Sequence, residues 1–271
     1  MTKKIVFVGG GNMGEALVAG LIGSRAWKPS QIIVTDVRPE QLEKLQKTYK
    51  VGTSADNRWA VRDAHVILLA VKPQHMKHVL EELGPLIRRA QLVLSIAAGI
   101  PTAFIENFLA KNVPVVRIMP NTPALVRQGA AAIALGRAAT ETHARTARSI
   151  METVGCVVTV PEKDMDAVTA VSGSGPAYVF YVAEAMKEAG VALGLAPHVA
   201  DQLVRQTIKG AGALLSQSHE EAHTLRQRVT SPGGTTEAAV NVMERAKVRA
   251  TFSKALKRAA ERSRELSRAQ H

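Results

Sequence analysis

The stretch that decides the fold runs from Lys3 to Leu17 and reads KKIVFVGGGNMGEAL. A short apolar run is followed by a glycine cluster and then by helix-forming residues, which predicts a strand, a tight turn and a helix start. Gly9, Gly11 and Gly14 have the spacing G-x-G-x-x-G. In such turns the first glycine makes the bend, the second lets a pyrophosphate approach the backbone, and the third packs helix against strand. The stretch therefore predicts dinucleotide binding, and the alternative is a turn with a purely structural role.

An acidic residue follows this turn at the distance where a ribose-binding group is expected. Asp36 comes directly after the next apolar run, Ile32 to Thr35. A carboxylate at this place favours the ribose 2′-hydroxyl of NADH and repels the 2′-phosphate of NADPH. Arg38 lies two residues further on and could accept that phosphate. We expect NADPH as the cofactor, with NADH as the alternative.

The composition is that of a globular protein with an unusually basic surface. The chain has 271 residues, of which 46% are hydrophobic and 21% charged, and its net charge is +12. The segment from Glu244 to Gln270 contributes nine Lys or Arg against three Glu. Aromatic residues are only 4% and no nucleic-acid motif is present. We therefore interpret the basic segment as a solvated helix face and expect no nucleic-acid partner.

The sequence also indicates where the protein works. Its single cysteine, Cys156, excludes an internal disulfide and fits a reducing compartment. We expect Cys156 to Val160 to form a buried strand, in which the cysteine is a small hydrophobic residue rather than a nucleophile. No apolar run approaches the ~18 residues that a membrane span requires, and the N-terminus does not resemble a signal peptide. We expect a cytoplasmic protein with no membrane partner.

Apolar runs alternate with helical patterns in the first part of the chain. The runs are short, rich in Val, Ile or Leu, and lie at 31–35, 65–70, 91–97, 113–119, 131–135 and 156–160. This is the pattern of a parallel sheet with helices on both faces. From Glu162 onward the pattern predicts only helices, at 178–189, 198–216 and 240–266. We predict an α/β fold with a Rossmann-type dinucleotide-binding domain at 1–161 and an all-α domain at 162–271.

The helical half is rich in Ala and Gly and has few large apolar residues. A unit built in this way has a thin core of its own. We therefore expect it to be buried against a second subunit, which predicts a homodimer.

Ligands of an open parallel sheet bind beyond the carboxyl ends of the strands. The segments at those ends are 9–14, 36–38, 70–74, 97–99 and 119–123. The small residues Ala97, Ala98 and Gly99 leave room for a flat ring and a ribose. Lys72 follows a strand and either contacts the cofactor or an anionic substrate, or is an exposed loop lysine.

The helical half has two glycine-rich loops of its own, each before a helix. They read VSGSGPAY at 171–178 and TSPGGTT at 230–236. Backbone N–H groups and hydroxyls at a helix start can hold a carboxylate, which makes Ser174 and the second loop candidate substrate-binding residues; the alternative is a turn with an N-cap. The histidine pairs 75/78 and 219/223 have no evident third ligand, so we expect no metal.

Motifs along nearly the whole chain resemble the pyrroline-5-carboxylate reductase family. They are GGGNMG at 9–14, AVKPQ at 70–74, SIAAGI at 95–100, MPNTP at 119–123, AVSGSGPAY at 170–178 and LRQRVTSPGGTTEAAVNVME at 225–244. The resemblance implies an N-terminal Rossmann domain and a C-terminal helical domain that interlocks with a partner into a dimer, often assembled further into a decamer. It also implies hydride transfer from NAD(P)H to the C=N carbon of 1-pyrroline-5-carboxylate, which gives L-proline.

The same resemblance implies roles for individual residues. Those implied to contact the cofactor are Gly9, Gly11, Asn12, Met13, Gly14, Asn57, Ala70, Val71, Lys72, Pro73, Ala97, Ala98 and Gly99, to which our own analysis adds Asp36 and Arg38. Those implied to hold the substrate carboxylate are Ser231, Gly233, Gly234, Thr235 and Thr236. The Thr236 hydroxyl is implied to lie near the ring nitrogen, and Thr236 and Lys72 are the catalytic candidates. A cyclic imine can take its proton from water, so no strong general acid is needed.

A related two-domain dehydrogenase, acting on another imine or on a hydroxy acid, is the alternative. Oxidation of a hydroxy acid needs a base that takes the hydroxyl proton, typically a lysine on a helix that faces the nicotinamide. The available helical lysines are Lys187 and Lys209, and neither lies in a glycine-framed motif.

Overall fold

The computed structural model describes residues 3–268. The chain forms two compact units. One contains the residues up to Ser174 together with those from Lys257 onward, and the other contains Gly175–Leu256. A domain boundary at residue 162 remains a prediction from the sequence.

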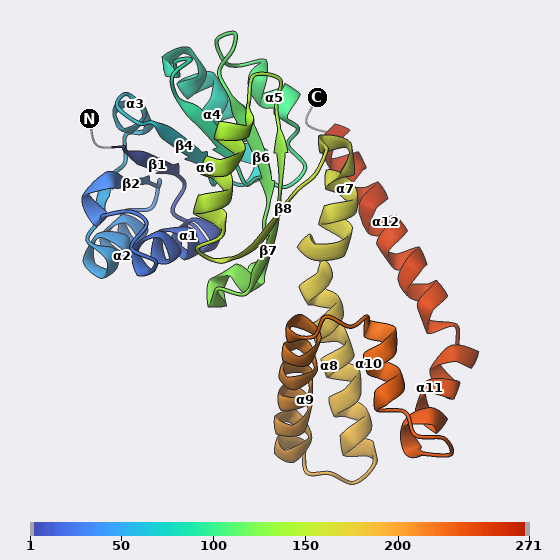
Figure 1. Ribbon diagram of the computed structural model, residues 1–271. Helices are drawn as coiled ribbons and strands as arrows, with labels where there is room; N and C mark the ends of the chain where they lie inside the picture. Colours follow the sequence, from blue (N-terminus) through green and yellow to red (C-terminus); the bar gives the residue numbers. More distant parts are fainter. Residues whose placement is uncertain (1–2, 269–271) are drawn as a thin grey trace. The chain divides into compact units, whose positions relative to one another are not determined.

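The first unit is built on one twisted sheet (Figure 1). Within residues 3–268 it has eight strands in the order β3-β2-β1-β4-β5-β6-β7-β8. They are β1 Ile5–Val8, β2 Ile32–Thr35, β3 Gly52–Ser54, β4 Val66–Leu69, β5 Leu92–Ser95, β6 Val115–Met119, β7 Gly129–Leu135 and β8 Gly155–Thr159. Neighbouring strands are parallel except β6 and β7. The chain order reverses beside β1, which is where such sheets bind dinucleotides.

Helices cover both faces of this sheet. They are α1 Asn12–Gly23, α2 Pro39–Tyr49, α3 Asn57–Val61, α4 Met76–Leu83, α5 Thr102–Glu106, α6 Glu141–Met151 and α7 Met165–Val168. Side chains of a strand alternate between its faces, and in β1 Phe7 joins the core beneath α1 and α6, whereas Val6 joins the core beneath α3 and α4. Because both faces of the sheet are covered at its centre, the central strands β1 and β4 are buried and apolar along their whole length, which explains why their sequence pattern was readable.

Three features of the sheet differ from the sequence-based expectation. Strand β3 was not expected, because its sequence Gly-Thr-Ser has no apolar run. Strands β6 and β7 are antiparallel rather than parallel. Cys156 is exposed rather than buried, because β8 is the last strand of the sheet and only Val157 of its five residues is buried.

The second unit is helical. Its helices are α8 Gly175–Ala192, α9 Pro197–Gln217, α10 Ala222–Arg228, α11 Thr235–Arg245 and the beginning of α12 Val248–Arg268. The single helix expected at 240–266 is wrong: α11 ends at Arg245 and Lys247 has a left-handed φ of 55° before α12 begins. Helices α8, α10 and α11 have no buried residue, and α9 buries only Ala200 and Val204. The thin core expected of this unit is confirmed.

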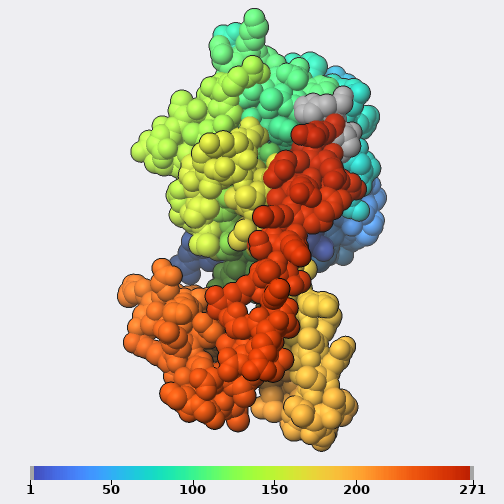
Figure 2. Space-filling model, turned by 90° about the vertical axis from the view of Figure 1, so that its right-hand side faces the viewer, coloured from blue at the N-terminus to red at the C-terminus, as the bar shows by residue number. Residues whose placement is uncertain are grey.

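The end of α12 belongs to the first unit, where it lies beside α7 (Figure 2). The buried Ser263 hydroxyl donates a 2.6 Å hydrogen bond to the Asp166 carboxylate on α7. Further along, a side chain at Gly99 would lie 3.7 Å from Leu266 and Ser267. The end of α12 therefore contacts the loop that follows β5. Among residues 3–268 no helix is long and apolar enough to span a membrane.

Candidate functional site

The glycine turn between β1 and α1 requires glycine at two positions for steric reasons. Gly9 has a φ of 105°, and a Cβ there would lie 2.8 Å from the Ala70 carbonyl oxygen. A Cβ at Gly14 would lie 2.7 Å from the Gly9 carbonyl oxygen. At Gly11, by contrast, a Cβ would meet no atom within 4 Å. The first and third glycines thus serve packing, whereas the second borders open space, as a turn that admits a pyrophosphate requires.

Two side chains form hydrogen bonds with the backbone of Gly10. Its N–H donates to Asp36 Oδ2 at 2.9 Å, and its carbonyl oxygen accepts from Gln41 Nε2 at 2.6 Å. Helix α1 has Gly11 as its N-cap, which has no side chain to pair with the free N–H groups of the first turn. Uncapped N–H groups and the helix dipole favour an anion at this end. The turn is therefore preorganised to bind a phosphate.

Asp36 and Arg38 form a two-pronged ion pair at the end of β2. Arg38 donates to the two carboxylate oxygens from Nε at 3.0 Å and from Nη2 at 3.2 Å. Burial alone would raise the pKa of the Asp36 carboxyl, but hydrogen bonds from Arg38 and from the Gly10 N–H outweigh burial and bring the pKa below its usual value. Asp36 is therefore ionised at neutral pH. The Asp36 side chain is 8% exposed and that of Arg38 is 51% exposed, so the guanidinium is the more accessible of the two charges.

The other expected cofactor residues follow neighbouring strands. Ala70 and Val71, after β4, touch the glycine turn, because the backbone at Gly9 lies against both. Lys72 is exposed and begins the short 3-10 turn Pro73–His75. Ala97 and Gly99, after β5, are buried, and Ala98 between them is exposed.

Asn57 follows β3, at the start of α3. Its Nδ2 donates to Glu82 on α4 at 3.3 Å. The structure thus brings Gly9–Gly14, Asp36 and Ala70–Val71 together through direct contacts.

In the second unit the loop before α11 forms a closed turn. Gly233 has a φ of 70°, and its N–H donates to the Glu237 carboxylate at 2.7 Å, while the Gly234 N–H donates to the Ser231 carbonyl oxygen at 3.0 Å. The N-cap of α11 is Gly234, which has no side chain, so Thr235 and Thr236 begin the helix without a side-chain cap. Thr236 is half-buried and Thr235 is exposed. This helix start can accept a carboxylate.

Ser174 follows a segment that is hydrogen-bonded to the loop after β6. After α7 the chain forms a wide π-type turn, Thr169–Gly173. The Asn121 side chain donates to the Ser172 carbonyl oxygen in this turn at 3.1 Å. Asn121 was not among the residues expected to act at the site, although it lies in the MPNTP motif at a strand end. Its position after β6 was the signal that could have found it.

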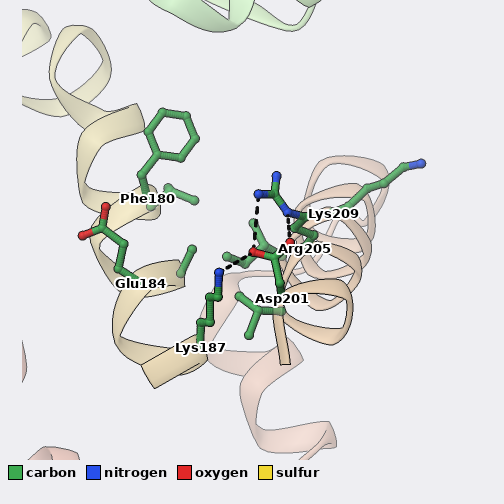
Figure 3. Close-up of a pocket in the computed structure, with 10 residues that line it drawn as sticks. Phe180, Glu184, Lys187, Asp201, Arg205 and Lys209 are labelled. Carbon is green, nitrogen blue, oxygen red and sulfur yellow. Dashed lines mark hydrogen bonds and ion pairs between the residues drawn. The ribbon is translucent and has the colours of Figure 1, made fainter. Parts of the chain in front are cut away.

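Of the two helical lysines, Lys187 is engaged in an ion pair. A groove of ≈ 560 Å³ lies between α8 and α9 (Figure 3), and in it Lys187 Nζ is 3.1 Å from the Asp201 carboxylate, which also pairs with Arg205. Lys209 extends away from this cluster (Figure 3). Because the Lys187 amino group is engaged in an ion pair with Asp201, the groove does not favour the hydroxy-acid alternative.

The fold and the glycine turn define a class of protein, the dinucleotide-dependent oxidoreductases. Residues 4–99 match the family model "NADP oxidoreductase coenzyme F420-dependent", and residues 162–266 match "Pyrroline-5-carboxylate reductase dimerisation". The chain is 42% identical to a pyrroline-5-carboxylate reductase of Pseudomonas aeruginosa, over 98% of this chain and 97% of the relative. It is 41% identical to one of Methanosarcina acetivorans, over 98% of each. The chain belongs to the pyrroline-5-carboxylate reductase family.

Solved structures agree with this assignment. A pyrroline-5-carboxylate reductase of Coxiella burnetii superposes with a TM-score of 0.93 at 41% identity, covering 98% of this chain and 99% of that one. A pyrroline carboxylate reductase of Plasmodium falciparum with NADP bound superposes with a TM-score of 0.86 at 29% identity, covering 98% of each chain. The α/β fold with a C-terminal helical region is thereby confirmed, and so is the resemblance found in the sequence.

Proposed function

We propose that this protein reduces 1-pyrroline-5-carboxylate to L-proline with NADPH, the last step of proline biosynthesis. The observation that carries the proposal is the uncapped start of α11, where Thr235 and Thr236 follow the Gly233–Gly234 turn. The N-cap Gly234 has no side chain to pair with the first-turn N–H groups, which are therefore available to a carboxylate, while Glu237 binds the Gly233 N–H. Similarity to reductases over the full chain supports the same substrate.

The residues of the first unit fit a dinucleotide. The open space at Gly11 and the free N–H groups of α1 suit its pyrophosphate. Asp36, Arg38 and Asn57 would hold the adenosine side, and Ala70 to Pro73 with Ala97 to Gly99 would line the nicotinamide side. When bound, the cofactor supplies the hydride. The chain's own residues then have to hold the two ligands in a reactive orientation, and such positioning is a large source of rate enhancement.

In the second unit, Ser231, Gly233, Gly234, Thr235 and Thr236 bind the substrate carboxylate. Ser174, in the first unit, is a further candidate for substrate binding. The Thr236 hydroxyl hydrogen-bonds the ring nitrogen, and Lys72 supplies a positive charge toward the anionic ligands. The proton that completes the amine comes from water. A cytoplasmic location fits the single cysteine.

Arg38 is expected to set the cofactor preference. Because Asp36 is already paired with Arg38 and the Gly10 N–H, the exposed guanidinium is the group available to a 2′-phosphate. Arg38→Ala should lower kcat/KM with NADPH about tenfold to a hundredfold, the usual effect of losing a charged hydrogen bond, and change kcat/KM with NADH less than about threefold. Equal losses with both cofactors would contradict this role.

We further propose that the protein is a homodimer and assembles into a higher homo-oligomer such as a decamer. The helical unit exposes large apolar side chains on α8, including Phe180 at 61% and Tyr181 at 73%. Apolar faces of this extent favour association. The dimerisation family model covers this region.

Sedimentation at micromolar concentration should therefore give a dimer or larger species. Phe180→Glu, on the face shown in Figure 3, should weaken the dimer at least about tenfold, because a charge is then desolvated at the interface. Trp59→Glu, which changes an exposed aromatic residue on α3, is the matched control and should leave the assembly intact. A strictly monomeric wild-type protein would refute the proposal.

The test of the proposed activity is oxidation of NADPH and of NADH, in parallel, with synthetic pyrroline-5-carboxylate as acceptor. We expect consumption of both cofactors with proline as product, and faster consumption of NADPH. A folded protein that binds both cofactors but oxidises neither would refute the assigned substrate.

A further inference from the structure

Pro176 forces the chain to break its helical path just before it. Proline has no N–H, and its ring would collide with the carbonyl group four residues earlier in a continuous α-helix. That carbonyl belongs to Ser172. The structure avoids the collision with the π-type turn Thr169–Gly173, in which the Ser174 N–H donates to the Thr169 carbonyl oxygen at 2.8 Å, five residues back. Turns of this kind are frequent at functional sites.

The break deprives the Ser172 carbonyl of its α-helical donor, and Asn121 supplies a donor. Asn121 Nδ2 donates to the Ser172 oxygen at 3.1 Å. The other side-chain atom, Oδ1, accepts from the Ala130 N–H, near the start of β7, at 2.8 Å. Since one partner is an acceptor and the other a donor, the orientation of the amide is determined. The half-buried Asn121 therefore bridges the sheet and the turn.

Met119, at the end of the strand before Asn121, also lies close to the turn. The backbone at Gly173 is so close to Met119 that an added Cβ would collide with its methyl carbon. Met119 ends β6, and Asn121 follows it by two residues. The edge of the sheet thus holds Ser172 by a hydrogen bond and Gly173 by packing, immediately before Ser174.

We propose that Asn121 is a positioning residue, which holds the Ser172 carbonyl so that Ser174 is presented to the substrate. The proposal rests on the proposed function, in which Ser174 contacts pyrroline-5-carboxylate. Without the amide the hydrogen bond that ties the Ser172 carbonyl to the loop after β6 is lost, and the turn can relax. A displacement of about 1 Å at a reacting group can cost up to a hundredfold in rate. The hydrogen bonds of Asn121 go to Ser172, Ala130 and Ala124 rather than to the glycine turn.

Two variants at Asn121 separate its two hydrogen bonds. Asn121→Asp keeps an acceptor for the Ala130 N–H but sets an oxygen against the Ser172 carbonyl, and Asn121→Ala removes both bonds without adding charge. Each should lower kcat about tenfold to a hundredfold and leave the Kd of NADPH within about twofold. Ser172→Ala is the matched control: it removes a hydroxyl that bonds the Val168 carbonyl, keeps the Ser172 carbonyl, and should retain activity within about twofold.

A double-mutant cycle tests whether Asn121 acts through Ser174. In a Ser174→Ala background, Asn121→Ala should lower kcat less than about threefold, because the group that it positions is already gone. Losses that multiply independently would overturn the proposal. So would wild-type turnover in Asn121→Ala, or a variant that unfolds or loses NADPH binding, which would indicate a structural role. A wild-type protein with no activity on pyrroline-5-carboxylate would instead refute the proposed function.

Discussion

Gly11→Val should abolish detectable binding of NADPH, a loss of at least about a hundredfold, and leave the protein folded. Gly11 has φ −66° and ψ −178°, a conformation that valine adopts without strain. An added Cβ meets no protein atom within 4 Å, so the folded chain accommodates the side chain. The same space is needed by the pyrophosphate, which the second glycine of the motif admits. Fluorescence titration with NADPH measures the loss.

Gly14→Val is the matched contrast. A side chain at Gly14 collides with the Gly9 carbonyl oxygen at 2.7 Å, so this variant should lose thermal stability as well as cofactor binding, through backbone strain and overpacking. Thermal unfolding at fixed protein concentration separates the two variants. If Gly11→Val binds NADPH within threefold of wild type, the pyrophosphate does not lie over this turn.

Thr236→Ala should lower kcat about tenfold to a hundredfold and leave the Kd of NADPH unchanged. The hydroxyl lies in the first turn of α11, where it can hydrogen-bond the ring nitrogen. A hydrogen bond to a charged group contributes about 1.5–3 kcal/mol, and each ~1.4 kcal/mol of transition-state stabilisation is tenfold in rate. Steady-state kinetics with pyrroline-5-carboxylate provide the measurement.

The conservative variant Thr236→Ser keeps the hydroxyl and should retain kcat within about threefold. Thr235→Ala, one residue earlier in the same helix turn, tests whether the loss is specific to position 236. If Thr236→Ala turns over at the wild-type rate, the hydroxyl has no part in the reaction.

Much of the first unit was predictable because its signals are local. The buried strands are mostly apolar, and the glycine turn combines three constraints within six residues. Strand β3 had no such signal, since Gly52–Ser54 is polar and joins the sheet only by pairing with β2. The burial of Cys156 was wrongly predicted for a related reason. The sequence pattern of an apolar strand is the same whether the strand lies at the edge of a sheet or in its middle.

The helical unit and the candidate site needed information that lies outside any single stretch. Nothing local marks the left-handed residue Lys247, where one expected helix becomes two. The anchoring of the turn before Ser174 joins Asn121 to a carbonyl 51 residues away. Sequence motifs identified the loops at 119–123 and 171–178. Only the fold shows that the Ser172 carbonyl, which Pro176 cannot pair with, accepts a hydrogen bond from Asn121.

The most direct test of the account is reduction of pyrroline-5-carboxylate with NADPH that carries deuterium at both C4 positions. Mass spectrometry and NMR of the product should show L-proline with one deuterium, attached to C5, the former C=N carbon. Because both C4 positions carry the label, the result does not depend on which face of the nicotinamide donates. Proline without deuterium at C5, or oxidation of the cofactor without proline, would contradict direct hydride transfer to the imine.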